Sequence, residues 1–410
     1  AHVFPSWHEG FGLPALEAMS CGTAALVSNL TSLPEIVNNT EALFDPYDEL
    51  SIANKMQQVI DDPEFRERLV KHGLKRAEKF TWENCAQQAL AAFKKVSLSN
   101  PDISRCDTTS KLTEINKKMP RVAIVTPLPP EQTGIADYMY ELLPALDKCF
   151  EVNLVVHQIK SDIPNGLCRS YIKNEEWFMS HANEMDHIIY QMGNSVFHRP
   201  VFDLMKIYPG LLVLHDFYLS DLLGYMELLE PDGHHWQKAL LNSHGYSPII
   251  EYLRAKQLPN HDRNEALTIL KKRYPCNLEL LDHATQVVIH SNFSKELAIK
   301  FYGEIAAEKI SSISLPRGPR LNTNKSNARK ELGISDEVIL VSSFGILAPS
   351  KLNHMLLEIW PNVQKQKKVE LVFVGKPVDE EYEAQLKRLM KPYSNVKITG
   401  WVDKASYHKY

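Results

Sequence analysis

No apolar run in this 410-residue sequence approaches the roughly 20 residues with which an α-helix spans a bilayer. A signal peptide, a C-x-x-C pair and low-complexity tracts are also missing. The net charge of -4 gives no reason to expect a nucleic-acid partner or a polybasic membrane contact. The six cysteines are scattered, which favours reduced thiols and predicts a cytoplasmic protein.

Strands and helices alternate along the chain. Buried strands without polar alternation are predicted at residues 1–6, 24–28, 121–126, 152–157, 187–192, 210–216, 286–291, 334–346, 369–376 and 396–401. Helical patterns lie between them, at residues 51–60, 64–96 and 138–146, and a helix that starts near Pro14 ends at Gly22. The alternation predicts α/β domains with doubly wound, Rossmann-like parallel sheets.

Residues 98–119 are polar and without periodicity, so we interpret them as a linker. They separate residues 1–97 from a second α/β region, which divides into residues 120–312 and 313–410. The chain is long enough for two or three domains.

The block VFPSWHEGFGLPALEAMSCGTAALVSN, at residues 3–29, followed by SLPEIV and FDP, resembles the donor-binding half of retaining glycosyltransferases of family 4. Its E-x7-E motif is Glu9 and Glu17. The resemblance implies the GT-B fold, in which two Rossmann-like domains are paired, and identifies residues 1–97 as the last part of one transferase. It implies no metal and no cofactor besides a nucleotide-sugar donor, GDP- or UDP-linked.

Residues 120–410 resemble a second transferase that stops early. TGIADY is similar to the acceptor-side glycine loop, YQMGNSVFH and YPGLLVLHDFYL to the central strand and HD motif of O-antigen and polysaccharide mannosyltransferases, and SSFGILAPSK to the loop with the donor-phosphate lysine. The two resemblances together predict that the sequence is a fragment of a protein with two transferase copies in tandem. Alternatively, the first and last segments complete one domain, since a 22-residue linker reaches about 70 Å when extended.

The residues of the first motif suit a donor site. Glycines at 10 and 12 let backbone N–H groups approach a ligand, and a helix N-terminus follows them. A carboxylate accepts two hydroxyl hydrogen bonds, and the resemblance assigns Glu17 to the ribose and Glu9 to the sugar. The donor-binding set from this block is Glu9, Gly10, Phe11, Gly12, Leu13 and Glu17.

Further donor-binding residues come from the second region by resemblance. They are Gly134, Gly345 and Lys351, the last of which matches the lysine that holds the donor diphosphate. Ile346 stands where family members often have an arginine, and Arg317 or Arg320 could substitute for it or be solvated loop charges.

His215 ends a buried strand, where an α/β domain presents residues to its crevice. The resemblance places this histidine near the reacting carbon, and Asp216 follows it; we predict both as catalytic. A histidine satisfied within the core is the other reading. The mechanism implied by the family needs no protein base, because the leaving phosphate oxygen takes the acceptor proton. Catalysis would then rest on positioning and stabilisation of the diphosphate.

These features predict a hexosyltransferase, for mannose, that builds a polysaccharide or lipid-linked glycan with retention of configuration. Peripheral association with the inner face of the plasma membrane is typical of such enzymes. The alternatives are a catalytically inactive copy that binds or scaffolds, favoured by Ile346, a nucleotide-sugar epimerase, and a phosphorylase. An epimerase would not need the TGIADY loop, and no pyridoxal-phosphate lysine context supports a phosphorylase.

Overall fold

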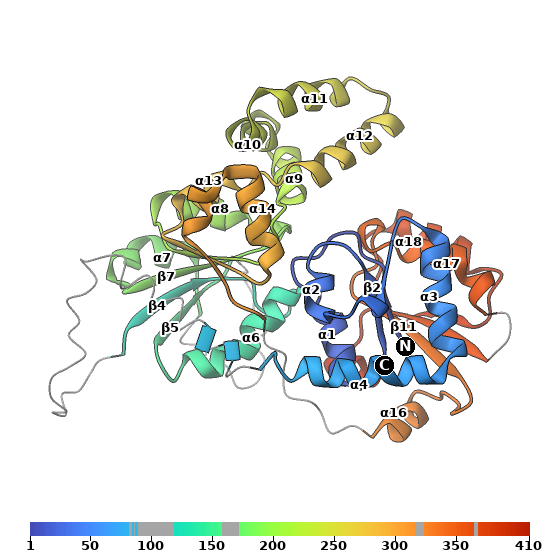
Figure 1. Ribbon diagram of the computed structural model, residues 1–410. Helices are drawn as coiled ribbons and strands as arrows, with labels where there is room; N and C mark the ends of the chain where they lie inside the picture. The colour runs from blue at the N-terminus through green and yellow to red at the C-terminus, as the bar shows by residue number, and fades with distance from the viewer. Residues whose placement is uncertain (82–83, 86, 89–118, 158–171, 316–323, 365–367) are drawn as a thin grey trace, which may run out of the picture. The chain divides into compact units, whose positions relative to one another are not determined.

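The computed structural model describes residues 1–81, 84–85, 87–88, 119–157, 172–315, 324–364 and 368–410. The chain divides into two compact units (Figure 1). Unit 1 combines residues 1–88 with residues 314–410, and unit 2 comprises residues 89–313. The predicted linker, residues 98–119, lies outside the described residues except for its last position.

Unit 1 contains a six-stranded sheet in the order β13-β12-β11-β1-β2-β3, with every neighbouring pair parallel. Its strands are β1 (His2–Phe4), β2 (Ala25–Ser28), β3 (Leu43–Phe44), β11 (Ile339–Phe344), β12 (Val369–Val374) and β13 (Val396–Ile398). β1 lies between β2 and β11, with His2 in register with Ser342. The first and last segments of the chain therefore share one sheet, whereas their assignment to two enzyme copies stays a prediction.

The helices of unit 1 pack on this sheet and on one another. They are α1 (Leu13–Ser20), α2 (Leu33–Val37), α3 (Glu49–Asp61), α4 (Pro63–Ala77), α16 (Lys325–Glu331), α17 (Asn353–Val363), α18 (Glu380–Met390) and α19 (Lys404–Tyr407). α1 contacts α4, and α3 from the first segment contacts α17 from the last. Leu16, Leu26 and Trp360 are fully buried, so both segments supply the core.

Unit 2 contains a seven-stranded parallel sheet in the order β10-β9-β8-β7-β4-β5-β6. Its strands are β4 (Arg121–Val125), β5 (Glu151–Val155), β6 (Ile172–Lys173), β7 (His187–Met192), β8 (Leu211–Leu214), β9 (Gln286–Ile289) and β10 (Ile310–Ser312). Their apolar residues form the cores of the unit together with the surrounding helices.

The helices of unit 2 include a long excursion between β8 and β9, which extends away from the sheet in Figure 1. The excursion consists of α9 (Ser220–Leu229), α10 (His235–His244), α11 (Tyr246–Lys256) and α12 (Asn260–Arg273). The other helices are α6 (Gly134–Leu146), α7 (Glu175–His181), α8 (Arg199–Ile207), α13 (Leu278–His283), α14 (Asn292–Tyr302) and α15 (Glu304–Glu308).

The two parallel sheets confirm the predicted α/β class with doubly wound, Rossmann-like domains. The predicted start of α1 is confirmed, with Pro14 in its first turn. The prediction of one helix over residues 64–96 is wrong, because α4 ends at Ala77 and a turn follows at residues 78–79. Phe80, which follows this turn, is buried, and its ring packs edge-on against that of Phe11, with ring centres 5.8 Å apart.

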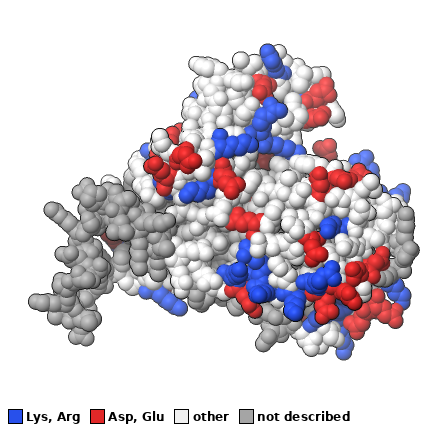
Figure 2. All heavy atoms as spheres, viewed as in Figure 1, with Lys and Arg blue, Asp and Glu red and all other residues white. Residues whose placement is uncertain are grey.

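No helix among the described residues is long and apolar enough to cross a membrane. Four cysteines within the described ranges are free thiols: Cys21, Cys85, Cys149 and Cys276. Figure 2 shows basic side chains gathered along α4 on the face in view, with acidic side chains interspersed among them. This face is therefore not dominated by charge of one sign.

Candidate functional site

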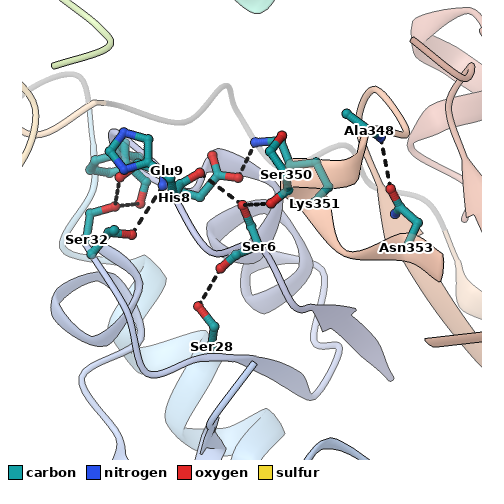
Figure 3. Close-up of polar contacts among 11 residues, drawn as sticks. Ser6, His8, Glu9, Ser28, Ser32, Ala348, Ser350, Lys351 and Asn353 are labelled. Atoms are coloured by element: carbon teal, nitrogen blue, oxygen red, sulfur yellow. Dashed lines mark hydrogen bonds and ion pairs between the residues drawn. The ribbon is translucent and has the colours of Figure 1, made fainter. Parts of the chain in front are cut away.

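Glu9 and Lys351 meet at the carboxyl edge of the sheet in unit 1. Glu9 lies in the loop after β1, and Lys351 lies in the 3-10 turn η6 (Pro349–Lys351) after β11. Because these neighbouring strands are parallel, both loops leave the sheet at the same edge. Lys351 Nζ forms an ion pair with Glu9 Oε1 (Figure 3). The side chains are 27% and 13% exposed, so the pair is largely withdrawn from solvent.

Two serines hold the loop that follows β1. Ser28 Oγ donates a hydrogen bond to the carbonyl oxygen of Ser6 at 2.7 Å, and Ser6 Oγ donates to that of His8 at 2.9 Å (Figure 3). Ser6 and Ser28 are fully buried. The backbone that carries Glu9 is therefore anchored to β2 by interior hydrogen bonds.

The backbone of Glu9 itself is bonded to the turn before α2. Its N–H donates to Thr31 Oγ1 at 3.2 Å. Ser32 Oγ lies within hydrogen-bond distance of two carbonyl oxygens, that of Glu9 at 3.0 Å and that of Phe11 at 2.9 Å. Fixed main chain on both sides of Glu9 limits the positions that its carboxylate can take.

The loop of Lys351 is tied both to itself and to the loop after β1. The Ala348 N–H donates to Asn353 Oδ1 at 3.1 Å, and the Trp7 N–H donates to the carbonyl oxygen of Ser350 at 3.2 Å. Lys351 Nζ also lies 5.7 Å from the centre of the Phe4 ring, within the range of a cation–π contact.

Glycine is required at Gly12 by both backbone and packing. Its φ of 101° is one that side chains rarely adopt, and a Cβ there would lie 2.5 Å from Leu33 Cδ2. α1 begins directly after it at Leu13. Phe11 is buried, whereas Gly10 and Leu13 are half-buried in the turn.

Gly345 begins the loop that leads to Lys351, and its φ of 113° again requires glycine. Gly375 leaves β12 beside it, and a Cβ on Gly375 would lie 1.8 Å from the Gly345 carbonyl oxygen. Ile346, which follows, is 39% exposed. Arg317 and Arg320 lie outside the described residues.

Glu17, on α1, accepts a hydrogen bond from Tyr407 Oη at 2.9 Å. The Tyr407 ring packs edge-on against Phe344, with ring centres 4.8 Å apart. Glu17 and Tyr407 line a cavity of about 950 Å³ within unit 1, together with the basic residues Lys325 and Arg329. The short helix that carries Tyr407 was not predicted from sequence.

In unit 2, His215 follows β8 and its ring lies among polar and aromatic groups from neighbouring elements. Its Nε2 is 2.7 Å from Oε1 of Gln191, which lies on β7. The ring centre is 4.7 Å from that of His290, the residue after β9, and 5.2 Å from that of Tyr138 on α6. The carboxyl ends of three adjacent strands thus bring these side chains together.

The imidazoles of this cluster are neutral near pH 7. Burial lowers the pKa of His215 well below its usual 6.5, and proximity to His290 and His198 lowers it further. Burial likewise lowers the pKa of His290 and of His198 to about 4 each. Removal from water disfavours the imidazolium, so each ring offers one N–H donor and one acceptor nitrogen.

Asp216 connects two loops at this edge, because its Oδ2 accepts a hydrogen bond from the Asn194 N–H at 3.0 Å. Asn194 Oδ1 in turn accepts from the N–H groups of Asp221 and Leu222 at the start of α9. Gly134 is the first residue of α6, and a Cβ there would meet nothing within 4 Å. Packing within the described residues therefore does not require glycine at 134 and leaves room for an approaching group.

The structure brings Glu9 and Lys351 together, and it places His215 and Asp216 on one loop. Sequence reasoning missed Gln191, His290 and Tyr138, although the ends of buried strands in an α/β domain are where such residues are expected. It also missed the serine anchors, because serine next to a strand has many structural uses. No group of three or more histidine, cysteine or acidic residues arranged for a metal occurs in the described part of the chain.

Residues 1–76 match the family model described as Glycosyl transferases group 1. The chain is similar to the serotype-specific mannosyltransferase WbdA of Escherichia coli, with 40% identity over 120 residues. This match covers 29% of the chain and 15% of that protein. It is also similar to the O-antigen chain mannosyltransferase B of Escherichia coli, with 47% identity over 92 residues, 22% of the chain and 24% of the relative.

These matches span about a quarter or less of the curated relatives' length. Among solved structures, the chain is similar to Anabaena HepE in complex with UDP-glucose, with a TM-score of 0.44 and 14% identity, covering 70% of each chain. The sequence matches show that the chain resembles O-antigen mannosyltransferases.

Proposed function

We propose that this chain forms part of a hexosyltransferase that moves mannose from a nucleotide-sugar, GDP- or UDP-linked, to a polysaccharide or lipid-linked glycan, with retention of configuration. The observation that carries the proposal is the ion pair of Lys351 with Glu9 beside the Gly12 turn. The names of the similar proteins, which are mannosyltransferases, support mannose as the sugar.

The two residues of the ion pair suit the two parts of a sugar nucleotide, the diphosphate and the sugar. Lys351 offers a partly buried cation, for which a diphosphate is a stronger partner than one carboxylate. Glu9, once released, accepts hydrogen bonds from sugar hydroxyls. The N-terminus of α1, directly after Gly12, adds N–H donors and partial positive charge on the same side of the sheet.

The reaction then depends on stabilising the charge that develops on the leaving diphosphate. Lys351 is the group of this chain that would do so, and an oxygen of the leaving phosphate would take the proton of the acceptor hydroxyl. Within unit 2, the neutral ring of His215 suits hydrogen bonding to a hydroxyl group better than acid catalysis. Positioning of donor and acceptor supplies the rest of the rate enhancement.

A second candidate is a nucleotide-sugar-binding module without transferase activity. Ile346, 39% exposed at the site where family members often have an arginine, favours it by leaving one cation fewer for the diphosphate. Transfer and binding must therefore be measured separately.

The test is isothermal titration of the full chain with GDP, UDP and GDP-mannose, followed by transfer of labelled mannose to a mannan acceptor. We expect Lys351→Met to weaken nucleotide binding by roughly ten- to a hundred-fold, the worth of a charge-assisted hydrogen bond. Lys368→Met is the matched control, since Lys368 is paired with Glu337 on the surface of the same unit. Unchanged nucleotide affinity in Lys351→Met would refute the proposal. Nucleotide binding without mannose transfer would instead support the binding module without transferase activity.

A further inference from the structure

Gln191 has a buried side-chain amide that contacts His215, the histidine predicted to be catalytic. It is 2% exposed, and its Oε1 lies 2.7 Å from His215 Nε2. The other end of the amide, Nε2, lies 4.0 Å from the sulfur of Met139. Sulfur is a weak acceptor, so this orientation places the NH₂ group against an acceptor and the carbonyl oxygen against His215.

This contact determines the tautomer of His215. A carbonyl oxygen only accepts, so the hydrogen bond requires the proton on Nε2. A neutral imidazole carries a single N–H, which leaves Nδ1 as a hydrogen-bond acceptor. Within the described part of the chain, Nδ1 has no hydrogen-bond partner, and the side chain is only half-buried. The nitrogen is therefore available to a donor from outside the protein.

The backbone of Gln191 is also hydrogen-bonded to its surroundings. Its carbonyl oxygen accepts from Nδ1 of His198 at 2.9 Å, and β7, which carries it, lies in the interior of the sheet between β4 and β8. The main chain that carries the amide is thus fixed on both sides by neighbouring strands.

We propose that Gln191 is a positioning residue that holds His215 in the Nε2–H tautomer, so that Nδ1 accepts a hydrogen bond from a hydroxyl group of the sugar substrate. The hydrogen bond to the sugar rests on the proposed function, whereas the effect of Gln191 on the His215 tautomer does not. The titratable groups around the His215 ring are His290 after β9, Tyr138 on α6 and His198 in the turn after β7, and Asp216 is its neighbour in the chain.

The first test reads the tautomer directly in the full chain labelled with ¹⁵N-histidine. His215 is assigned by the signals that disappear in His215→Asn. We expect wild type to show a protonated Nε2 and an unprotonated Nδ1, and Gln191→Leu to show a mixture of tautomers. Met139→Leu is the matched control, because it changes the packing of Gln191 but keeps the carbonyl contact; its spectrum should match wild type. A protonated Nδ1 in wild type, or no change in Gln191→Leu, would overturn the inference.

The second test uses GDP-mannose. Its addition should shift the His215 Nδ1 resonance, whereas GDP alone should not, because the sugar supplies the hydroxyl. If both ligands shift it equally, or neither does, the sugar contact is wrong even where the tautomer is as expected. That outcome separates a failure of the proposed function from a failure of the positioning role.

A third readout is the pH profile of mannose transfer. Gln191→Glu places a carboxylate against Nε2, which favours the imidazolium and raises the pKa of His215. Transfer should then fall as pH decreases through the raised pKa, because Nδ1 becomes a donor. In wild type, the rate of mannose transfer should show no such decrease above pH 6. Identical profiles in both proteins would contradict the role, since a purely structural effect changes the rate at all pH values alike.

Discussion

Lys351 and Glu9 are 342 positions apart in the chain, yet their side chains form an ion pair at one edge of one parallel sheet. The pairing of β1 with β11 produces this contact. Because the two strands are parallel, the loops that follow them lie at the same edge of the sheet. The carboxylate of Glu9 is thus the ion-pair partner of the partly buried Lys351 ammonium group. The predictions concern this pair and Gly12 in unit 1, and Gly134 and the buried histidines in unit 2.

Breaking the pair from one side should destabilise unit 1. Glu9→Gln or Lys351→Met leaves a charge that is largely withdrawn from solvent without its partner, which costs about 1–3 kcal/mol. The double variant should recover part of this loss, because neither charge remains. Urea unfolding of the two single variants and the double variant gives the coupling. The exposed pair Lys368–Glu337 is the control and should couple by less than about 1 kcal/mol.

Gly12→Ala should lower stability as well as donor binding. The backbone there has a φ of 101°, and the added methyl group would meet Leu33 Cδ2 at 2.5 Å. We expect a loss of about 1–3 kcal/mol, from the strained conformation and the displaced side chain. Thermal unfolding measures it. A melting temperature equal to that of wild type would show that the turn relaxes without cost.

Gly134→Ala separates packing from ligand approach. No atom lies within 4 Å of the added Cβ and the position is helical, so stability should be unchanged or slightly raised. Where a ligand approaches this backbone, titration with GDP-mannose should nevertheless show weaker binding. An alanine variant with wild-type affinity would remove Gly134 from the binding residues.

Stability should fall as the pH decreases below about 6.5. Folding lowers the pKa of His198 and of His290 to about 4 each, whereas an unfolded histidine titrates near 6.5. Between these values the unfolded chain binds more protons, so the free energy of unfolding rises with pH. The slope is up to about 1.4 kcal/mol per pH unit for each histidine. Urea midpoints at pH 5, 6 and 7 test it, and His290→Asn should reduce the slope. An equal slope in that variant would show that His290 is protonated in the folded protein.

The sequence was sufficient to predict the strands that are buried on both sides, because their unbroken apolar runs are typical of parallel sheets. The two-residue strands β3 and β6 and the edge strand β10 were missed, since so short a segment carries no periodicity. Helix α4 was predicted too long because periodicity alone does not indicate where a buried aromatic residue such as Phe80 turns the chain.

For the candidate sites, resemblance to family motifs predicted Glu9 and Lys351, which the structure brings into contact. It could not find Gln191 or His290, whose significance depends on the distance from their side chains to His215. Nor could it show that Glu17 contacts Tyr407, since that contact joins residues 390 positions apart. Contacts of this kind depend on the order of strands in the sheet, which local sequence does not determine.

The central place of β1 in its sheet has a consequence for the order of folding. Unit 2 is built from contiguous chain, so its sheet can form as soon as its own residues have been synthesised. β1 and β11 are neighbours in the sheet of unit 1, although all of unit 2 lies between them in the chain. Closing a loop of this length costs entropy before any contact repays it, so unit 1 should be the later and slower unit to fold.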